Sequence, residues 1–534
     1  MSSITSSFFE DSLKNFIDIY YKEIVPRLTK KNKVVAISAA VLLTVLYKVN
    51  QIIRPPRNLR HIPYQGYFDF MSSIFKKESP LVKAERFSLP LLDSAKGNGI
   101  YLRPGRFAWE AQISNPEAVK KILLKTDTFP KDETVQKFKK ALGYKFFGGP
   151  NIVTLNGHNW KEQRKLTNPA FHRSMPVALF GKLTQQLFSL IENNGGTAEM
   201  NDVMQKWTLD AIGKAGFDFD FNALTDKNSE WVNVYNTIWN GITSPLFIFF
   251  PFLDNHLNWL FPHRRMVRRD LNRFLAKIDE MIEMKRKKLQ SGQDDNEHWA
   301  ENEKDLLTLM LEAEMKGEGK MTNEELQSNI CIFFIAGHDT TANALSFALY
   351  YLAVHPEIQQ RAREEAISIL GDEPEDVLPT VADTKNMTYI NQIIKEVLRI
   401  NGPVNNISAR IAQEDCELAG TFIPKGTQLV INMFDIHHCK KNWSNPLVFD
   451  PERFAGDGAQ VAGQGMTWVP FGNGGRQCIG MNFSLAEQRV FLSMMLKKYT
   501  WRLPADSIHN DGVKIAGIGL VGPTKLNINF TKRY

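Results

Sequence analysis

Residues 471–480 read FGNGGRQCIG and contain Cys478, one of only four cysteines in the 534-residue chain. The glycines of this stretch let the backbone adopt a positive φ and approach a flat surface without an intervening Cβ. The residues after Cys478 repeat with an apolar helical period, so we expect its sulfur near a helix N-terminus, where the pKa of a thiol falls. The stretch therefore predicts a thiolate loop that faces a flat partner.

Two neighbouring side chains suit a haem as that partner. Arg476 can pair with a propionate carboxylate, and Phe471 can pack beside the sulfur and exclude water. A lone cysteine in a Gly-rich turn is more often structural, but Phe-x-x-Gly-x-Arg-x-Cys-x-Gly should occur by chance on the order of once in ten thousand such chains. A structural role is therefore a poor explanation of this stretch.

The stretch resembles the cysteine-ligand loop of the cytochrome P450 superfamily. It matches the fixed positions of that loop at Phe471, Gly474, Arg476, Cys478 and Gly480. The resemblance implies that these residues bind haem b and that Cys478 is the axial ligand of its iron. In that family the thiolate pushes electron density onto the iron and favours O–O cleavage.

Residues 324–355 predict a long helix buried in the middle of a large domain, because the segment is apolar nearly all round. Gly337 is unfavourable there by about 1 kcal/mol relative to Ala, and Asp339 and Thr340 are polar groups that need partners when buried. Such a threonine can bond back to a carbonyl one turn earlier. The stretch AGHDTT also resembles the oxygen-binding segment of the family, which implies that its small residues leave room over the iron and that Asp339 and Thr340 deliver protons.

Three further residues resemble propionate-binding positions of the family. Trp160 and Arg164 are four residues apart and share a helix face, and an arginine at such spacing otherwise often lies on a surface. Arg410 matches by position, although residues 401–403 are one residue longer than the corresponding segment of many members. The resemblance implies that all three contact the haem propionates.

Glu396 and Arg399 lie at i and i+3 on one face of an otherwise apolar helix. Alone, such a pair usually lies on a surface, but the later segment PERF at 451–454 supplies a second arginine, Arg453. Together they resemble the Glu-Arg-Arg triad of the family. The resemblance implies a structural role behind the haem for Glu396, Arg399 and Arg453, without part in the chemistry.

Residues 34–47 form an uncharged, mostly apolar run that extends to residue 53 if three polar residues are tolerated. About 20 helical residues span roughly 30 Å, enough to cross a bilayer. A buried core helix is the alternative, and a signal peptide is disfavoured because the run begins late and lacks a small-residue cleavage site. Basic residues flank both ends, so the positive-inside rule does not fix an orientation.

The chain should therefore divide into three parts. We expect an N-terminal segment with a membrane anchor at 1–53, a stiff proline-containing linker at 54–66 and a haem-thiolate catalytic domain at 67–534. Composition alone suggests two or three domains for this length, whereas the resemblance implies one haem domain. The expected fold is mainly α with a small β-rich part, the cytochrome P450 fold, preceded by the anchor helix.

Residues 244–261 are unusually aromatic and interrupted by Pro245 and Pro251. The segment is either plain core or, as its position in the family implies, a loop that lies on the membrane and forms an apolar substrate entrance. The net charge of +7 is modest. The sequence also lacks the basic block and interleaved aromatic residues that are typical of a nucleic-acid surface. We therefore expect membrane lipid and a small apolar molecule as partners, and no nucleic acid.

Cysteine usage and glycosylation sequons predict the compartment. The cysteines show neither a disulfide framework nor zinc spacing, which fits a reducing compartment. One Asn-x-Ser/Thr sequon, at Asn482, follows Cys478 so closely that a glycan would disrupt the loop. We therefore expect the endoplasmic reticulum membrane, with the catalytic domain on the cytosolic side.

The resemblance implies a monooxygenase that inserts one oxygen atom of O₂ into an apolar organic substrate, such as a lipid, sterol, terpenoid or xenobiotic. Electrons are expected from NADPH through a separate flavoprotein, NADPH-cytochrome reductase, with a small cytochrome as an alternative donor. Candidate pocket residues lie near Ala336, at 404–407 and at 518–521. They are apolar or small apart from an Asn405-Asn406 pair and do not name the substrate.

Two other function classes remain open. A haem-thiolate isomerase or dehydratase acting on a peroxide needs no O₂ activation, and the Asp339-Thr340 pair argues against it. A non-catalytic haem protein would sense or store a small ligand. Dependence on a reductase separates the first alternative from a monooxygenase, and any turnover with NADPH and reductase excludes the second.

Overall fold

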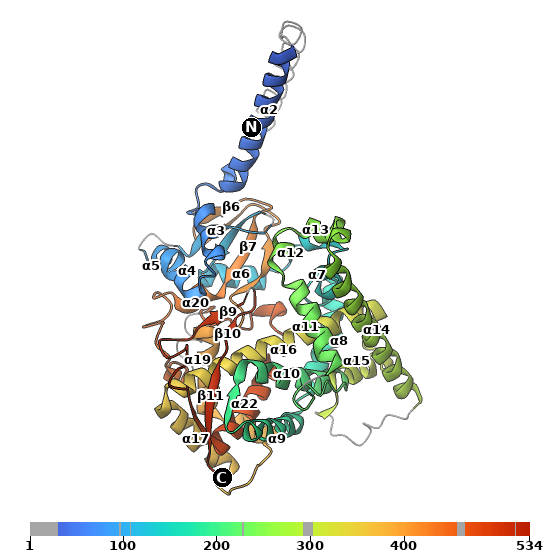
Figure 1. The fold of residues 1–534 in the computed structure, drawn as a ribbon, viewed down its shortest axis with the longest axis vertical. Helices are drawn as coiled ribbons and strands as arrows, with labels where there is room; N and C mark the ends of the chain where they lie inside the picture. Colours follow the sequence, from blue (N-terminus) through green and yellow to red (C-terminus); the bar gives the residue numbers. More distant parts are fainter. Residues whose placement is uncertain are drawn as a thin grey trace.

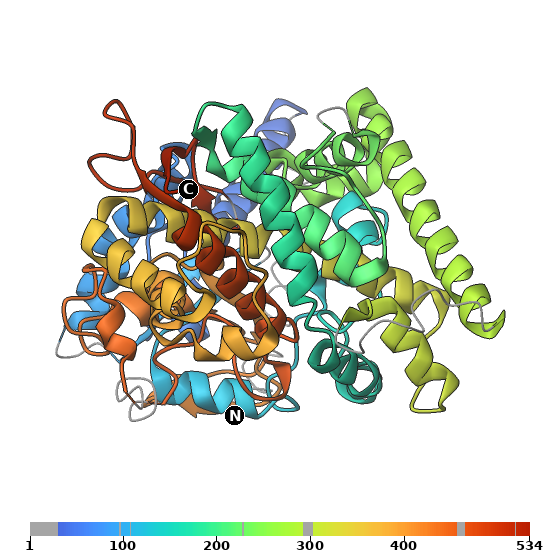
Figure 2. The same ribbon diagram turned by 90° about the horizontal axis from the view of Figure 1, so that it is seen from below.

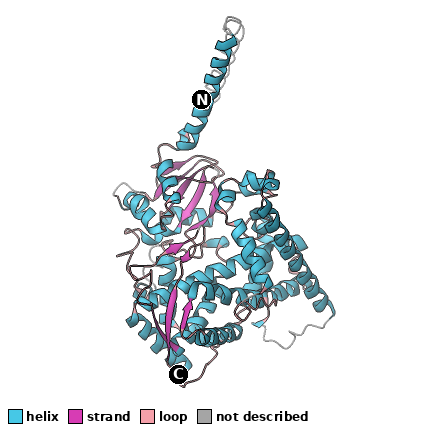
Figure 3. Cartoon of the chain, in the orientation of Figure 1, coloured by secondary structure: helices cyan, strands magenta, loops and turns pink. Residues whose placement is uncertain are grey.

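The computed structural model describes residues 30–94, 98–106, 108–226, 229–291, 303–456, 465–517 and 519–534. Two predicted features lie partly outside these residues: the start of the N-terminal segment (1–29) and Ile518 of the candidate pocket. Helices make up most of the described chain, and the strands gather in small sheets on one side (Figures 1 and 3). The predicted mainly α fold with a small β-rich part is confirmed.

The α-helices are α2 (Lys30–Ile53), α3 (Tyr67–Phe75), α4 (Pro80–Lys83), α5 (Leu89–Asp93), α6 (Pro116–Leu124), α7 (Leu142–Phe147), α8 (Gly157–Arg173), α9 (Val177–Asn193), α10 (Met200–Phe217), α11 (Glu230–Ile242), α12 (Pro245–Phe249), α13 (Pro251–His256), α14 (Pro262–Ser291), α15 (Leu306–Met315), α16 (Asn323–Val354), α17 (Pro356–Leu370), α18 (Val381–Asn386), α19 (Thr388–Asn401), α20 (Met433–His438) and α22 (Met481–Lys498). The strands are β1 (Ile100–Pro104), β2 (Trp109–Ile113), β3 (Thr197–Glu199), β4 (Asn406–Ile411), β5 (Cys416–Leu418), β6 (Thr421–Ile423), β7 (Gln428–Asn432), β8 (Tyr499–Arg502), β9 (Ile515–Ala516), β10 (Gly522–Pro523) and β11 (Asn527–Lys532).

Helix α16 runs through the middle of the molecule (Figure 1). It begins with a capping box, in which the Thr322 side chain accepts from the Glu325 N–H and the Glu325 carboxylate accepts from the Thr322 N–H. It ends just before His355, because the following Pro356 disfavours the helical conformation in the preceding residue. The predicted central helix at 324–355 is thus confirmed to within a residue.

Gly337 allows α10 to pack closely against α16. A Cβ at this position would lie 2.8 Å from Ile212 of α10, which is too close for two carbon atoms. The expectation that the small residues of AGHDTT serve mainly to leave room over the iron is therefore incomplete. Gly337 makes room for a neighbouring helix, and Ala336 is the small residue whose surface is open.

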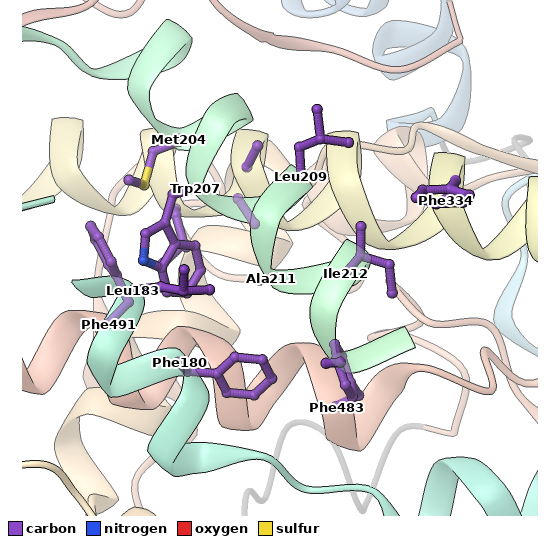
Figure 4. Close-up of a cluster of buried hydrophobic side chains, with 14 of the residues drawn as sticks. Phe180, Leu183, Met204, Trp207, Leu209, Ala211, Ile212, Phe334, Phe483 and Phe491 are labelled. Atoms are coloured by element: carbon purple, nitrogen blue, oxygen red, sulfur yellow. The ribbon is translucent and has the colours of Figure 1, made fainter. Parts of the chain in front are cut away.

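Aromatic side chains fill the core between α9, α10 and α22 (Figure 4). Phe180 of α9 meets Phe483 of α22 edge to face, with ring centroids 5.2 Å apart, and Trp207 of α10 meets Phe491 of α22 at the same separation. Helix α9 lies beside both α10 and α22 (Figures 1 and 2). This packing fixes the start of α22, and with it the loop that carries Cys478.

The largest sheet has the strand order β1-β2-β7-β4. β1 and β2 are antiparallel, β2 and β7 parallel, and β4 and β7 antiparallel with an irregular register between Ile407 and Arg410. An isolated bridge joins Val404, just before β4, to Leu520. Two of the candidate pocket segments, far apart in sequence, therefore meet.

Helix α2 projects from one end of the molecule (Figure 1). Its apolar side chains are exposed from Val34 to Ile52, and residues Ile37–Leu59 form a stretch long and apolar enough to cross a membrane. At the end of the helix, the Trp109 indole of β2 donates to the Ile52 carbonyl over 3.1 Å. The exposed side chains exclude the alternative of a buried core helix.

Candidate active site

The Cys478 loop lies between α6, α8 and the start of α22. Gly472 and Gly474 have φ of 65° and 68°, and a Cβ on Gly474 would approach the Leu123 carbonyl of α6 to 2.9 Å. The Cys478 N–H donates to the Phe471 carbonyl over 2.8 Å and closes the loop. Gly475 and Gly480, in contrast, do not take a positive φ, so the expectation of a positive φ is wrong for these two glycines.

The Cys478 side chain is accessible and yet densely surrounded. Its residue surface is exposed, yet burial among protein atoms raises its pKa, against the opposing effects of the Gly480 N–H and the Arg164 charge. From these two properties together we infer that the thiol borders an internal hollow. Ala336 is likewise exposed although it lies in the middle of the buried helix α16.

The predicted effect of the α22 N-terminus on Cys478 is outweighed in this structure. A helix N-terminus lowers the pKa of a thiol, but the net direction here is upward because burial is the largest cause. The net direction of the Cys478 pKa is therefore opposite to the predicted one. A cationic metal facing the sulfur would supply the missing charge, because a coordinating thiol is deprotonated outright.

Cationic side chains gather beside the loop. The Arg476 guanidinium stacks over the Trp160 ring at 3.8 Å and donates to the Leu155 carbonyl over 2.7 Å. Arg164 donates to the Gln477 carbonyl over 2.8 Å, and Arg410, 1% exposed, makes one long contact of 3.4 Å with the Phe129 carbonyl. The structure thus brings all four predicted propionate-binding residues to one side of the loop.

Each of these four side chains keeps a buried N–H without a partner among the described residues. The atoms are Trp160 Nε1, Arg164 Nε, Arg410 Nε and Nη2, and Arg476 Nε. Buried donors are almost always paired in native proteins. Several such donors in one cluster indicate that an anionic group belongs between them.

The lowered pKa values of the basic groups in this cluster also indicate that an anionic group belongs between them. Burial lowers the pKa of Arg410 to about 10, and burial with the charges of Arg410 and Arg164 lowers that of Arg476 to about 9. Lys131 has its pKa lowered well below the usual value by burial and then by the charges of Arg410 and Arg476. Lys131 is a cation of this site that the sequence analysis missed, because no spacing relates it to the other residues.

The Glu-Arg-Arg residues also meet, away from the cation cluster. Both carboxylate oxygens of Glu396 accept from Arg399 over 2.7 Å, and Arg453 Nε lies 3.4 Å from Glu396 Oε1. Arg399 also donates to the His437 and Pro446 carbonyls. The three residues therefore join α19 to the end of α20, at His437, and to the segment from Pro446 to Arg453.

The polar residues of α16 have local contacts. The Thr340 hydroxyl donates to the Ala336 carbonyl one turn earlier. Asp339 is 4% exposed, its Oδ2 has no partner among the described residues, and burial raises its pKa. The next residue, Thr341, forms a 2.9 Å hydrogen bond with Ser484 of α22, which ties this part of α16 to the helix that follows Cys478.

These residues fit a haem. The open thiol of Cys478 would be a ligand for the iron. The neighbouring cations, whose donors lack partners among the described residues, would bind the carboxylates, and the exposed surface at Ala336 would leave space beside the haem. The fold and the site together define a haem-thiolate protein.

Comparisons with known proteins agree. The family model described as cytochrome P450 matches residues 110–527. The chain is 29% identical to human cytochrome P450 3A5 over 82% of either chain, and 30% identical to human cytochrome P450 4F8 over 72% of this chain and 75% of that protein. It is 29% identical to the pig taurochenodeoxycholic 6 alpha-hydroxylase over 72% of this chain and 76% of that protein. The heme domain of cytochrome P450DA superposes with a TM-score of 0.73 at 23% identity, covering 91% of this chain and 99% of that domain.

The chain belongs to the cytochrome P450 family. It is an oxidoreductase of the monooxygenase class, and its cofactor is haem.

Proposed function

We propose that this protein is a membrane-bound monooxygenase that inserts one atom of O₂ into an apolar organic substrate, with electrons from NADPH through a separate flavoprotein reductase. The observation that carries the proposal is the exposed Cys478 thiol beside a cluster of cations with unpaired donors, in a loop whose following helix is bonded to α16 through Ser484 and Thr341. When bound, the haem supplies the oxygen activation that no amino-acid side chain can perform.

The residues around the loop would hold the cofactor. Cys478 would supply the sulfur ligand of the iron, and Trp160, Arg164, Arg410 and Arg476 would donate the N–H groups that lack a partner among the described residues to the propionates. Charge-assisted hydrogen bonds from guanidinium to carboxylate are about twice as strong as neutral ones. Lys131 would add a further positive charge once the propionates offset the repulsion from Arg410 and Arg476, and Phe471, Gly474 and Gly480 shape the loop.

Asp339 and Thr340 would move protons during the reaction. The raised pKa of Asp339 means that burial favours its protonated form, which can give up a proton. Thr340 lies one turn from Ala336, so its hydroxyl is held at the edge of the hollow. Its bond to the Ala336 carbonyl uses the hydroxyl proton and leaves the oxygen lone pairs available as acceptors.

The substrate is expected to be largely apolar and to approach past residues 244–261. Leu246, Phe250, Phe252, Trp259 and Leu260 are exposed there, and α12 and α13 lie at the same end of the molecule as α2 (Figure 1). A cavity of about 60 Å³ lies beneath them, lined largely by apolar residues that include Phe147 and Phe247. These observations favour a membrane-facing entrance over plain core.

The names of the relatives support hydroxylation but leave the substrate class open. One relative is named as a hydroxylase of a bile-acid conjugate, so lipids and sterols stand beside terpenoids and xenobiotics as candidates. Titrating the purified protein with a panel of such compounds should shift the haem spectrum only for those that enter the hollow. The absence of a shift with every apolar compound would contradict the proposed substrate class.

We further infer an anchor at 1–53, a linker at 54–66 and a cytosolic catalytic domain on the endoplasmic reticulum membrane. Deleting residues 1–53 should greatly reduce attachment to membranes and leave haem binding intact, because the apolar side chains of α2 from Val34 to Ile52 are exposed. Some attachment through residues 244–261 should remain. Sedimentation with membranes and haem content per protein measure the two effects.

Deleting residues 1–29 alone is the control for this truncation, because it keeps α2. That shorter deletion should stay in the membrane fraction. A 1–53 deletion that could not take up haem would show instead that α2 belongs to the catalytic fold.

Replacing Thr340 by alanine should uncouple oxygen reduction from product formation. The haem spectrum should persist and NADPH should still be consumed with the reductase, but oxygen should leave as hydrogen peroxide. Positioned proton transfer contributes a factor of about 10² to 10⁴ in rate. The rate of product formation should fall by a factor approaching that range. Asp339→Asn should chiefly slow turnover. Measuring NADPH, peroxide and product in one reaction separates these outcomes.

Thr184→Ala is a matched control, because the Thr184 hydroxyl makes the same bond to a carbonyl one turn earlier, in α9. It should leave the coupling unchanged. If Thr340→Ala also left it unchanged, the back-bonded hydroxyl would be only a local helix contact.

A further inference from the structure

A buried histidine and tyrosine stand beside Asp339. His338 of α16 is 4% exposed and Tyr235 of α11 is 1% exposed. The Nδ1 of His338 lies 3.3 Å from the Tyr235 hydroxyl and 3.5 Å from Oδ1 of Asp339. The two rings meet edge to face with centroids 5.2 Å apart. One nitrogen therefore faces both the hydroxyl and the carboxyl group.

Tyr235 and Asp339 compete for this nitrogen. A neutral imidazole carries a proton on only one of its two nitrogens. If Nδ1 carries it, the imidazole can donate to the carboxylate of Asp339. If Nδ1 carries none, it accepts from the Tyr235 O–H and offers nothing to Asp339.

The geometry favours the second arrangement. Nδ1 of His338 is the only hydrogen-bond partner of the Tyr235 hydroxyl among the described residues, 3.3 Å away, whereas its 3.5 Å separation from Asp339 is not accompanied by a hydrogen bond. A buried O–H rarely lacks an acceptor, so the hydroxyl donates to Nδ1. Burial raises the pKa of Tyr235 well above its usual value, followed by the nearby Asp339 charge, so the hydroxyl keeps its proton and remains a donor. Asp339 Oδ2 also lacks a partner among the described residues.

Apolar side chains border the Tyr235 side of this group, and on the other side of α16 Thr341 contacts Ser484 and the buried Glu487. Phe146 of α7 and Phe274 of α14 border the Tyr235 ring, at centroid distances of 6.5 Å, and Ile212 of α10 packs against Gly337. Burial is the largest influence on the pKa of Asp339, and the charge of His338 is the second and acts in the opposite direction. His338 is therefore the neighbouring group through which the pKa of Asp339 can change.

We propose that Tyr235 is a positioning residue that fixes Nδ1 of His338 as an acceptor and thereby keeps the Asp339 carboxyl group protonated and ready to donate. The inference rests on the proposed proton-delivering role of Asp339. It assigns Tyr235 and His338, on two different helices, to the control of that proton.

Replacing Tyr235 by phenylalanine tests the proposal. Without the hydroxyl, Nδ1 is free to carry the proton and to donate to the Asp339 carboxylate. A hydrogen bond to the charged form lowers the pKa of a carboxyl group, here by about one pH unit or more. The infrared C=O band of protonated Asp339, assigned by its absence in Asp339→Asn, should therefore disappear at lower pH in Tyr235→Phe than in the wild-type holoenzyme.

Two further variants make the test specific. Tyr350→Phe removes a buried hydroxyl elsewhere on α16 and should leave the midpoint of the Asp339 band in place. In a His338→Leu background, Tyr235→Phe should no longer move the midpoint, because the imidazole that links the two groups is gone. A shift that persisted in that background would overturn the role of His338.

The pH dependence of turnover is an independent measurement of the protonation of Asp339. Coupled product formation should decline with rising pH as Asp339 loses its proton, and in Tyr235→Phe this decline should move to lower pH by the same amount as the infrared midpoint. An unchanged or raised midpoint would refute the inference even in an active enzyme. An inactive wild-type enzyme would instead refute the proposed function, while the infrared band could still be read.

Discussion

Cys478→Ala should lose the strongly red-shifted Soret band of the reduced carbon-monoxide complex and should have no measurable monooxygenase turnover. That band reports a thiolate bound to the iron. Cys478 is the cysteine whose side chain borders the internal hollow, in a loop closed by its own N–H to the Phe471 carbonyl. An alanine leaves the iron without its sulfur ligand and so removes the electron donation that favours O–O cleavage.

The other cysteines serve as matched controls. Cys331 is fully buried in the apolar face of α16, and burial raises its pKa far above the usual value. Cys439 is buried with its thiol 3.3 Å from an Asp93 carboxylate oxygen, and Cys416 lies in the hairpin strand β5. Alanine at each of these positions should leave the band unchanged. A Cys478→Ala protein that retained the band would refute the assignment.

Glu396→Ala should prevent haem incorporation and lower the free energy of unfolding by about 3–5 kcal/mol, the usual result of removing one partner from a buried ion pair. Glu396 is fully buried and accepts two 2.7 Å bonds from Arg399 and one of 2.9 Å from the Asp450 N–H. Without it, the Arg399 guanidinium, also buried, and the nearby Arg453 lose their counter-ion. The loss should loosen the joint between α19 and the chain that leads to the Cys478 loop.

Haem content and denaturant unfolding of the purified protein measure this effect. Glu452→Ala is the control, because Glu452 lies next to Arg453 but forms an exposed ion pair with Arg361. Exposed pairs contribute about 0–1 kcal/mol, so this variant should keep its haem. A Glu396→Ala protein as stable and as rich in haem as Glu452→Ala would show that the triad is dispensable.

The sequence predicted well what depends on local spacing. Trp160 and Arg164 share α8, Glu396 and Arg399 share α19, and AGHDTT lies in the long buried helix, because helical period and apolar pattern are local properties. The loop around Cys478 was also predictable, since its glycines and arginine stand next to one another. Its open side on an internal hollow is consistent with the predicted flat partner.

The parts of the site that the sequence did not predict depend on contacts between segments that are distant in the chain. Lys131 joins the cation cluster through the fold alone, and Tyr235 reaches His338 across more than a hundred residues. Gly337 is explained by Ile212 of another helix. The direction of the Cys478 pKa was predicted wrongly because the helix N-terminus is visible in the sequence, whereas the burial that outweighs it is not.

Two rival functions make different demands on the same site. An isomerase or dehydratase that acts on a peroxide would need neither the reductase nor a proton from Asp339. A haem protein that only binds a small ligand would show spectral shifts without turnover. The buried carboxyl oxygen of Asp339 has no partner in the part of the chain that the structure describes and lies near the exposed Ala336, which favours a reaction that consumes protons.

The fate of isotopically labelled dioxygen tests the central claim most directly. The protein, reconstituted with NADPH-cytochrome reductase and a compound that shifts its haem spectrum, is supplied with NADPH under labelled O₂. We expect one labelled oxygen atom in each product molecule, the other in water, and no product without NADPH or reductase. Product that carries no label, or that forms without reductase, would contradict a monooxygenase.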